Sequence, residues 1–149
     1  MHHKRSFRRK LQTFFLSLLL VLLTVAGVPS AAYTAEAASA DTTMAVHFLD
    51  VGQGLSILVQ SQGQNLLYDG GDRGHSSFVV SYLQKQNISI IDYMISSHYD
   101  EDHVAGLVGC LDSFSVKNVI GADYVQDTKI YQSFENSVAA QGLTVQHPK

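Results

Sequence analysis

Short apolar runs and helical periodicities alternate along residues 44–146. Runs rich in Val, Ile, Leu and Tyr predict strands at residues 44–50, 56–60, 65–68, 92–96 and 116–120. The glycine-containing segment 52–54 joins the first two strands, and 61–64 turns the chain into a hairpin. Apolar residues at helical spacing predict helices at 76–86, from 103 to 111, and around 131–138. Gly142 is expected to close the last helix before a short apolar run at 143–146.

This succession predicts an α/β fold in which ligands gather outside the carboxyl ends of strands. Directly after the apolar run 90–95 comes the segment Ser96-Ser97-His98-Tyr99-Asp100-Glu101-Asp102-His103, with two histidines and three carboxylates in six positions. Imidazole suits zinc, iron or manganese, and carboxylate suits harder cations. A mixed set therefore predicts a catalytic divalent metal site and, with it, metal-assisted hydrolysis.

Two plainer interpretations of this segment stay open. Residues 99–102 can form a solvated acidic turn that caps the following helix, because carboxylates are favourable at a helix N-terminus without any metal. The turn can also hold a structural calcium ion, although calcium rarely uses histidine. The flanking His98 and His103 favour a transition-metal site over both.

Two further motifs lie upstream of this segment. They precede the order His-x-Asp-x-Asp-His of residues 98–103, and they are His47-Phe48-Leu49-Asp50-Val51-Gly52-Gln53-Gly54 and Leu66-Leu67-Tyr68-Asp69-Gly70-Gly71. Together, in this order and spacing, the three resemble the metallo-β-lactamase superfamily, and within it the hydrolase domain of ComEC-like competence proteins. Asp100 stands where the superfamily more often has a second histidine. The resemblance covers roughly residues 45–147.

The resemblance implies a set of residue roles. His98 and Asp100 would bind a first metal, and Asp102 and His103 a second, with Asp102 also expected to serve catalysis. Asp69 would hold the loop of residues 98–103 in place without itself binding metal. Zinc or manganese is implied, as one or two ions that activate a water molecule, with a phosphodiester as the substrate class.

The implied fold is a two-halved αββα sandwich, of which only the first half is expected here. The second half of that fold supplies further ligands, so activity of the truncated chain is a separate question from activity of the family. His147 is expected to be an ordinary surface residue and not a replacement ligand. The alternative function is therefore a catalytically inactive remnant or a metal-binding module.

The N-terminal segment has the organisation of a secretory signal peptide. Residues 2–10 carry five basic residues and no acid, residues 11–28 are almost wholly apolar, and small residues follow Pro29 up to residue 40. This predicts a signal peptide at 1–40, a domain at 41–149 and a secreted protein. An anchored form with an uncleaved segment is the alternative, and membrane contact is expected only through this segment.

Charge limits the partners of the predicted domain. Residues 41–149 hold five Lys and Arg against twelve Asp and Glu, a net charge of −7 with neutral histidine. No basic patch is expected for a nucleic acid, so a nucleic-acid phosphodiester would depend on bound cations, and a small-molecule phosphodiester is equally compatible. Cys110 is the only cysteine. It excludes an internal disulfide and is expected to be a small buried filler.

Overall fold

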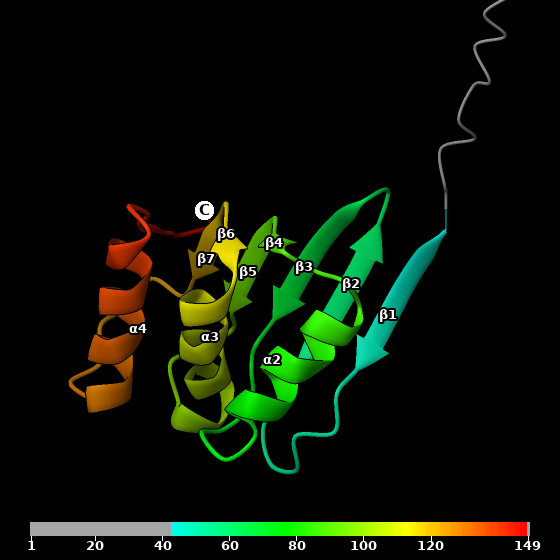
Figure 1. Cartoon of the computed structure of the whole chain (residues 1–149). Coiled ribbons are helices and arrows are strands. Elements are labelled where there is room, and N and C mark those ends of the chain that lie inside the picture. Colours follow the sequence, from blue (N-terminus) through cyan, green and yellow to red (C-terminus); the bar gives the residue numbers. More distant parts are fainter. Residues whose placement is uncertain (1–42, 149) are drawn as a thin grey trace, which may run out of the picture. The chain divides into compact units, whose positions relative to one another are not determined.

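The computed structural model describes residues 43–148. The predicted signal peptide at 1–40 lies outside these residues. The described chain forms a mixed six-stranded sheet in the order β1-β2-β3-β5-β7-β8, and a two-stranded sheet in which β4 pairs with β6 (Figure 1). The strands are β1 Met44–Phe48, β2 Ile57–Ser61, β3 Gln64–Tyr68, β4 Ile90–Ile91, β5 Tyr93–Ser96, β6 Ser115–Val116, β7 Val119–Gly121 and β8 Val145–Gln146.

Three helices lie together over one face of the large sheet (Figure 1). They are α2 Ser76–Lys85, α3 Glu101–Ser113 and α4 Lys129–Ala140. The first three strands are antiparallel, and β3, β5, β7 and β8 run parallel to one another, with the helices in the connections. The predicted α/β arrangement is confirmed. Among the described helices, none is long and apolar enough to cross a membrane.

The core lies between the helices and the face of the sheet that they cover. Leu58, Leu67, Met94 and Val119 sit side by side on neighbouring strands, and all four are completely buried. The helices contribute Val79, Leu83, Val104, Leu107, Cys110, Phe134 and Val138 to the same cluster. The prediction that Cys110 is a buried filler is confirmed.

The opposite face of the sheet is apolar but only partly covered. Phe48 is 77% exposed and Val46 42% exposed, on the strand face opposite His47. On the neighbouring strands the same face carries Ile57 and Ile95, whose side chains are partly buried. The described helices all lie over the other face of the sheet (Figure 1).

Several predicted boundaries were wrong. The strand predicted at 116–120 is two strands, β6 and β7, which belong to different sheets. The strand predicted at 92–96 is confirmed within one residue as β5, but the separate strand β4 was missed. Asp92 lies between β4 and β5, and its buried carboxylate accepts hydrogen bonds from the Asn65 backbone N–H and from Lys117 Nζ. Apolar periodicity alone could not detect the division between β6 and β7, because the two strands pair with different partners, β4 and β5, that come much earlier in the chain.

The ends of two helices can also be compared with the predictions. Helix α3 begins at Glu101, two residues before the predicted start, so the acidic residues 101 and 102 lie in its first turn. Gly142 has a φ of 72° and ends the last helix in the left-handed conformation, as predicted.

Candidate metal centre

The carboxyl ends of β3 and β5 bring Asp69 and Ser97 together. The two strands are parallel, with Tyr68 opposite Ile95, and the Asp69 backbone N–H donates to the Ile95 carbonyl at 2.9 Å. The residue after each strand therefore emerges at the same edge of the sheet. Asp69 is completely buried and has a φ of 56°, a conformation that Asp tolerates better than most residues.

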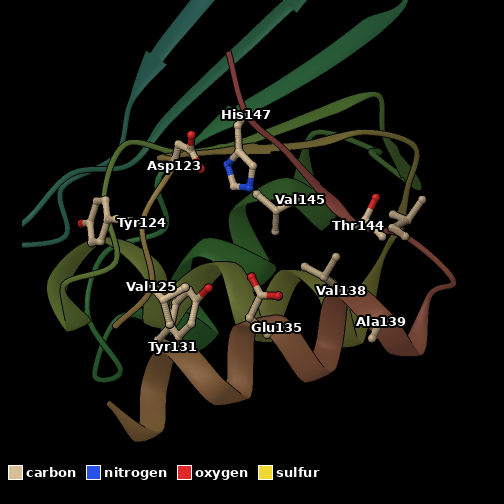
Figure 2. A pocket seen from close by; sticks show the side chains of 11 residues that line it. Asp123, Tyr124, Val125, Tyr131, Glu135, Val138, Ala139, Thr144, Val145 and His147 are labelled. Atoms are coloured by element: carbon tan, nitrogen blue, oxygen red, sulfur yellow. The ribbon is translucent and has the colours of Figure 1, made fainter. Parts of the chain in front are cut away.

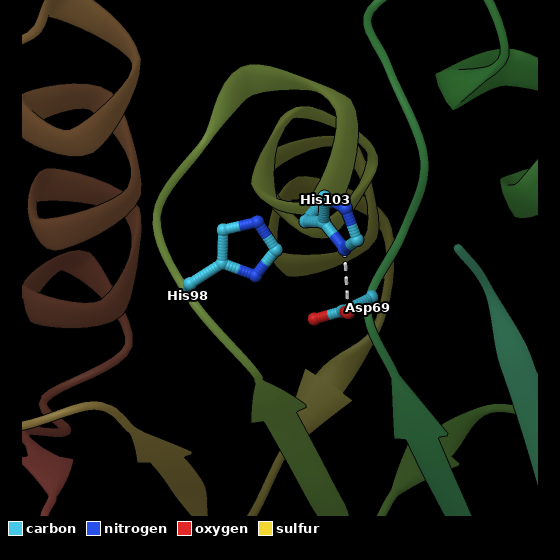
Figure 3. A group of neighbouring side chains, drawn as sticks. All are labelled: Asp69, His98 and His103. Carbon is cyan, nitrogen blue, oxygen red and sulfur yellow. Dashed lines mark hydrogen bonds and ion pairs between the residues drawn. The ribbon is translucent and has the colours of Figure 1, made fainter. Parts of the chain in front are cut away.

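Asp69, His98 and His103 form a compact group at this edge (Figure 3). One potential ligand atom from each lies within 4.8 Å of those of the other two. The ring centroids of His98 and His103 are 3.9 Å apart. His98 comes from the loop after β5, and His103 from the first turn of α3.

The Asp69 carboxylate is occupied by protein donors. Its Oδ1 accepts from the Ser97 backbone N–H at 2.8 Å, and its Oδ2 from the Ser97 hydroxyl at 2.6 Å and from His103 Nδ1 at 2.8 Å. Although Asp69 belongs to the compact group, these bonds make it a poor ligand. The contacts are those of a residue that orients others, and the assignment of Asp69 to bracing stays a prediction.

Asp100 and Asp102 lie beside the outer nitrogens of the two histidines. Asp100 Oδ2 is 3.6 Å from His98 Nε2, and Asp102 Oδ2 is 3.8 Å from His103 Nε2. The pairs agree in position with the two predicted ligand pairs, whose roles stay predictions. Asp100 occupies the N-cap position of α3 but makes no capping hydrogen bond with its side chain. It accepts instead from Gln126 Nε2 at 3.0 Å, so helix capping does not account for this carboxylate.

The glycine-containing loop 52–54 reaches the site through Gln53. Its Nε2 donates to Asp102 Oδ2 at 3.4 Å. Gly54, with a φ of 97°, passes so close to the Asp102 backbone that a Cβ would overlap its carbonyl oxygen. The loop can therefore approach the start of α3 only with glycine at this position.

Tyr99 anchors the segment between β5 and α3, which carries His98 and Asp100, from inside the protein. Its side chain is completely buried, and its hydroxyl donates to the Ala122 carbonyl at 2.8 Å. Burial, with nearby tyrosine and acidic groups, raises the pKa of Tyr99 to about 12. The hydroxyl therefore stays protonated, and holds its hydrogen bond, well beyond neutral pH.

His147 does not belong to the compact group, and it lines a cavity of about 300 Å³ between α4 and the strand β8 (Figure 2). Its Nδ1 is 3.2 Å from the Gly121 carbonyl oxygen. Asp123 and Glu135 also line this cavity. The side chain is exposed, as an ordinary surface residue would be.

The donor set fits a divalent cation. His98 and His103 use their Nδ1 atoms within the protein, which leaves two Nε2 atoms, each beside a carboxylate. Nitrogen and oxygen donors of this kind suit zinc and manganese. The chemistry available at this edge of the sheet is therefore that of a metal site built from imidazole and carboxylate.

Three contacting residues were missed by the sequence analysis. Ser97, Gln53 and Gln126 each hydrogen-bond a predicted site residue. Gln53 belongs to one of the three motifs that carry the family resemblance, which could have indicated it. Nothing in the sequence pattern indicated Gln126, which lies 26 positions from its partner.

Comparisons with known proteins agree with this picture. The family model described as the metallo-beta-lactamase superfamily matches residues 49–128. The chain is similar to Recombination protein 2 of Haemophilus influenzae, with 39% identity over 77 residues, which cover 48% of this chain and 10% of that protein. It is also similar to Competence protein ComA of Neisseria gonorrhoeae, with 36% identity over 63 residues, 42% of this chain and 9% of that protein. The chain thus spans about a tenth of the length of these curated relatives. The predicted resemblance to the competence-protein branch is confirmed.

Solved structures with similar folds were also found. A Cronobacter sakazakii metallo-beta-lactamase with a HARLDQ motif matches with a TM-score of 0.47 and 19% identity, over 52% of this chain and 30% of that one. The metallo-beta-lactamase FIM-1 from Pseudomonas aeruginosa, in its mono-zinc form, matches with a TM-score of 0.40 and 12% identity, over 71% and 44% of the two chains.

Proposed function

Since the chain belongs to the metallo-beta-lactamase superfamily, we propose that it acts in metal-dependent hydrolysis of a phosphodiester. One observation carries the proposal. The rings of His98 and His103 are 3.9 Å apart, and each presents an Nε2 atom to a neighbouring carboxylate. This is a set of donors for one or two divalent cations at the edge where strands end.

The proposed ligands fall into two pairs. His98 and Asp100 would hold one cation, and Asp102 and His103 a second. Zinc is favoured by imidazole, and manganese by the two carboxylates, so both are candidates. Gln126 holds the Asp100 carboxylate and Gln53 the Asp102 carboxylate by hydrogen bonds.

A bound divalent cation supplies two kinds of chemistry in such sites: it lowers the pKa of a coordinated water and polarises a substrate oxygen. The chain's own contribution is orientation. Asp69 and Ser97 fix the imidazoles from the buried side. Asp102 is the carboxylate we assign to catalysis, because it is partly buried and lies between Gln53 and His103.

The substrate class is proposed from the resemblance to competence proteins. The net charge of −7 over residues 41–149 disfavours long-range attraction of a polyanion. A small phosphodiester, or a nucleic acid whose phosphates are neutralised by the bound cations, is compatible with this charge. Export is proposed from residues 1–40 alone, which carry the basic and apolar regions of a signal peptide. Mass measurement of the mature protein, from the medium and from the membrane fraction, distinguishes a cleaved form from an anchored one.

The test of the metal site is titration of the full chain with zinc and with manganese, followed by metal analysis of the dialysed protein. We expect about one or two ions per chain. The double variant His98→Ala/His103→Ala should bind none, whereas His147→Ala, a matched loss of an exposed histidine, should bind as the unaltered chain does. Hydrolysis of bis(p-nitrophenyl) phosphate then reports on activity.

The outcomes separate the alternatives. Metal binding without hydrolysis of phosphodiesters would replace the enzyme by a metal-binding module. A folded chain that binds no metal would indicate an inactive remnant. Calcium binding that survives the double histidine substitution would point to a structural ion held by the acidic turn alone.

A further inference from the structure

Ser97 occupies a central position between the buried carboxylate and a histidine. Its hydroxyl oxygen lies 2.6 Å from Asp69 Oδ2 and 2.8 Å from His98 Nδ1. A hydroxyl has one hydrogen to donate, and a carboxylate oxygen can only accept. The hydroxyl therefore donates to Asp69 and accepts from His98, which requires a proton on His98 Nδ1.

The same argument fixes the second imidazole directly. His103 Nδ1 lies 2.8 Å from Asp69 Oδ2, so the ring donates to the carboxylate from Nδ1. In both rings the lone pair is then on Nε2, the atom next to Asp100 in one case and Asp102 in the other. One buried carboxylate sets both proton positions, directly for His103 and through a hydroxyl for His98.

We propose that Ser97 is a positioning residue that couples His98 to Asp69 and keeps His98 Nε2 free to bind a cation. The cation-binding part of this inference rests on the proposed function, whereas the hydrogen-bond part does not. Ser97 also donates its backbone N–H to Asp69 Oδ1 at 2.8 Å, which fixes its own place against the carboxylate. Free imidazole prefers the proton on Nε2, so without the hydroxyl His98 should lose its bias towards Nδ1.

The neighbouring Ser96 provides a matched control. Its hydroxyl also contacts His98, but it donates to the backbone carbonyl of His98 at 2.8 Å and not to the imidazole ring. Ser96→Ala removes a hydroxyl one residue away without removing the coupling between the imidazole and Asp69. Ser97→Thr keeps a hydroxyl at the coupling position and should restore what Ser97→Ala loses.

The experiment is a long-range 1H–15N correlation spectrum of histidine-labelled, metal-free full chain, at a pH above the ordinary titration range of histidine. In the unaltered chain, both His98 and His103 should show protonated Nδ1. In Ser97→Ala, His98 should shift towards protonated Nε2 while His103 stays unchanged. Ser96→Ala and Ser97→Thr should keep the original pattern for both rings.

Zinc titration of the same samples gives the second readout. Loss of an outer hydrogen-bond partner of a ligating histidine typically lowers metal affinity by about 10- to 100-fold, which is the effect expected for Ser97→Ala. Protonated Nε2 on His98 of the unaltered chain would overturn the inference whether or not any variant folds. An unchanged His98 tautomer in folded Ser97→Ala would overturn it as well. Failure of the unaltered chain to bind metal would overturn the proposed function, and the tautomer result would still decide the hydrogen-bond coupling.

Discussion

His103 Nδ1 and Asp69 Oδ2 lie 2.8 Å apart, although the two residues are 34 positions apart in the chain. Asp69 directly follows β3, and His103 lies in the first turn of α3. Two backbone bonds keep these segments together, from Gly70 N–H to the His103 carbonyl and from Gly106 N–H to the Gly71 carbonyl. The imidazole is thus oriented by a carboxylate that is itself rigidly placed.

Replacing this carboxylate tests its orienting role. Asp69→Asn keeps the size of the side chain and its tolerance of positive φ, but puts an NH2 group where one acceptor oxygen was. We expect metal affinity to fall by about 10- to 100-fold, measured by calorimetric titration with zinc. Asp92→Asn, a second buried aspartate remote from the histidines, should leave affinity unchanged. Equal affinity of the Asp69→Asn protein would remove Asp69 from any role in the site.

Gly106 and Gly109 should respond oppositely to alanine. Alanine favours a helix interior by about 1 kcal/mol over glycine. At position 106, however, a Cβ would overlap the Gly70 carbonyl, which is fixed backbone, whereas at 109 it meets the movable hydroxyl of Ser76.

In urea unfolding, Gly106→Ala should therefore lower the free energy of unfolding by more than about 1 kcal/mol, because backbone must move to admit the methyl group. Gly109→Ala should leave stability unchanged or raise it slightly. A Gly106→Ala protein as stable as the unaltered chain would show that α3 does not need this close approach to the loop after β3.

Asp92 should contribute to stability at neutral pH and lose that contribution in acid. The Lys117 ammonium, followed by the Asn65 backbone N–H, lowers the pKa of Asp92 below its ordinary value of 3.8. The contribution is present above the unfolded-state pKa and disappears as pH falls through the lower folded-state pKa. Lys117 is 58% exposed, so solvent screening limits the pair to about 1 kcal/mol. Asp92→Asn should lose this amount at pH 7 and show a shallower decline of unfolding free energy below about pH 4.

Cys110 should make the protein sensitive to alkali. Burial raises the pKa of its thiol from 9.0 to about 12. Because the folded state holds the proton more tightly, its stability contribution is present below the unfolded-state pKa and is lost as pH rises from about 9 towards 12. The slope for one proton is at most about 1.4 kcal/mol per pH unit.

Cys110→Ala should accordingly flatten the decline of unfolding free energy between about pH 9 and 10, before Tyr99 begins to contribute in the same direction. Chemical denaturation across this pH range measures the effect. A decline as steep as that of the unaltered chain would mean that the thiol is exposed to ionisation in the folded state.

Most strands and helices could be predicted because their apolar spacing is local. The hairpin of β2 and β3 and the helix α4 carry that spacing over whole elements. The division of the predicted strand 116–120 into β6 and β7 could not be predicted, since it depends on pairing with β4 and β5, which come much earlier in the chain. Apolar periodicity reflects only residues that are close in the sequence, so it cannot reveal bonds to segments this far away.

The sequence by itself determined the family resemblance, the α/β alternation and the ligand-type residues His98, Asp100, Asp102 and His103, since all of these depend on residue identity and local spacing. Only the tertiary structure decided which nitrogen of each histidine faces outward. That choice depends on Asp69 and Ser97, which the parallel pairing of β3 and β5 brings to one edge of the sheet. Asp69, an acceptor delivered by another strand, fixes the His103 imidazole directly and sets the direction of the Ser97 hydroxyl that contacts His98, which local spacing along the chain cannot specify.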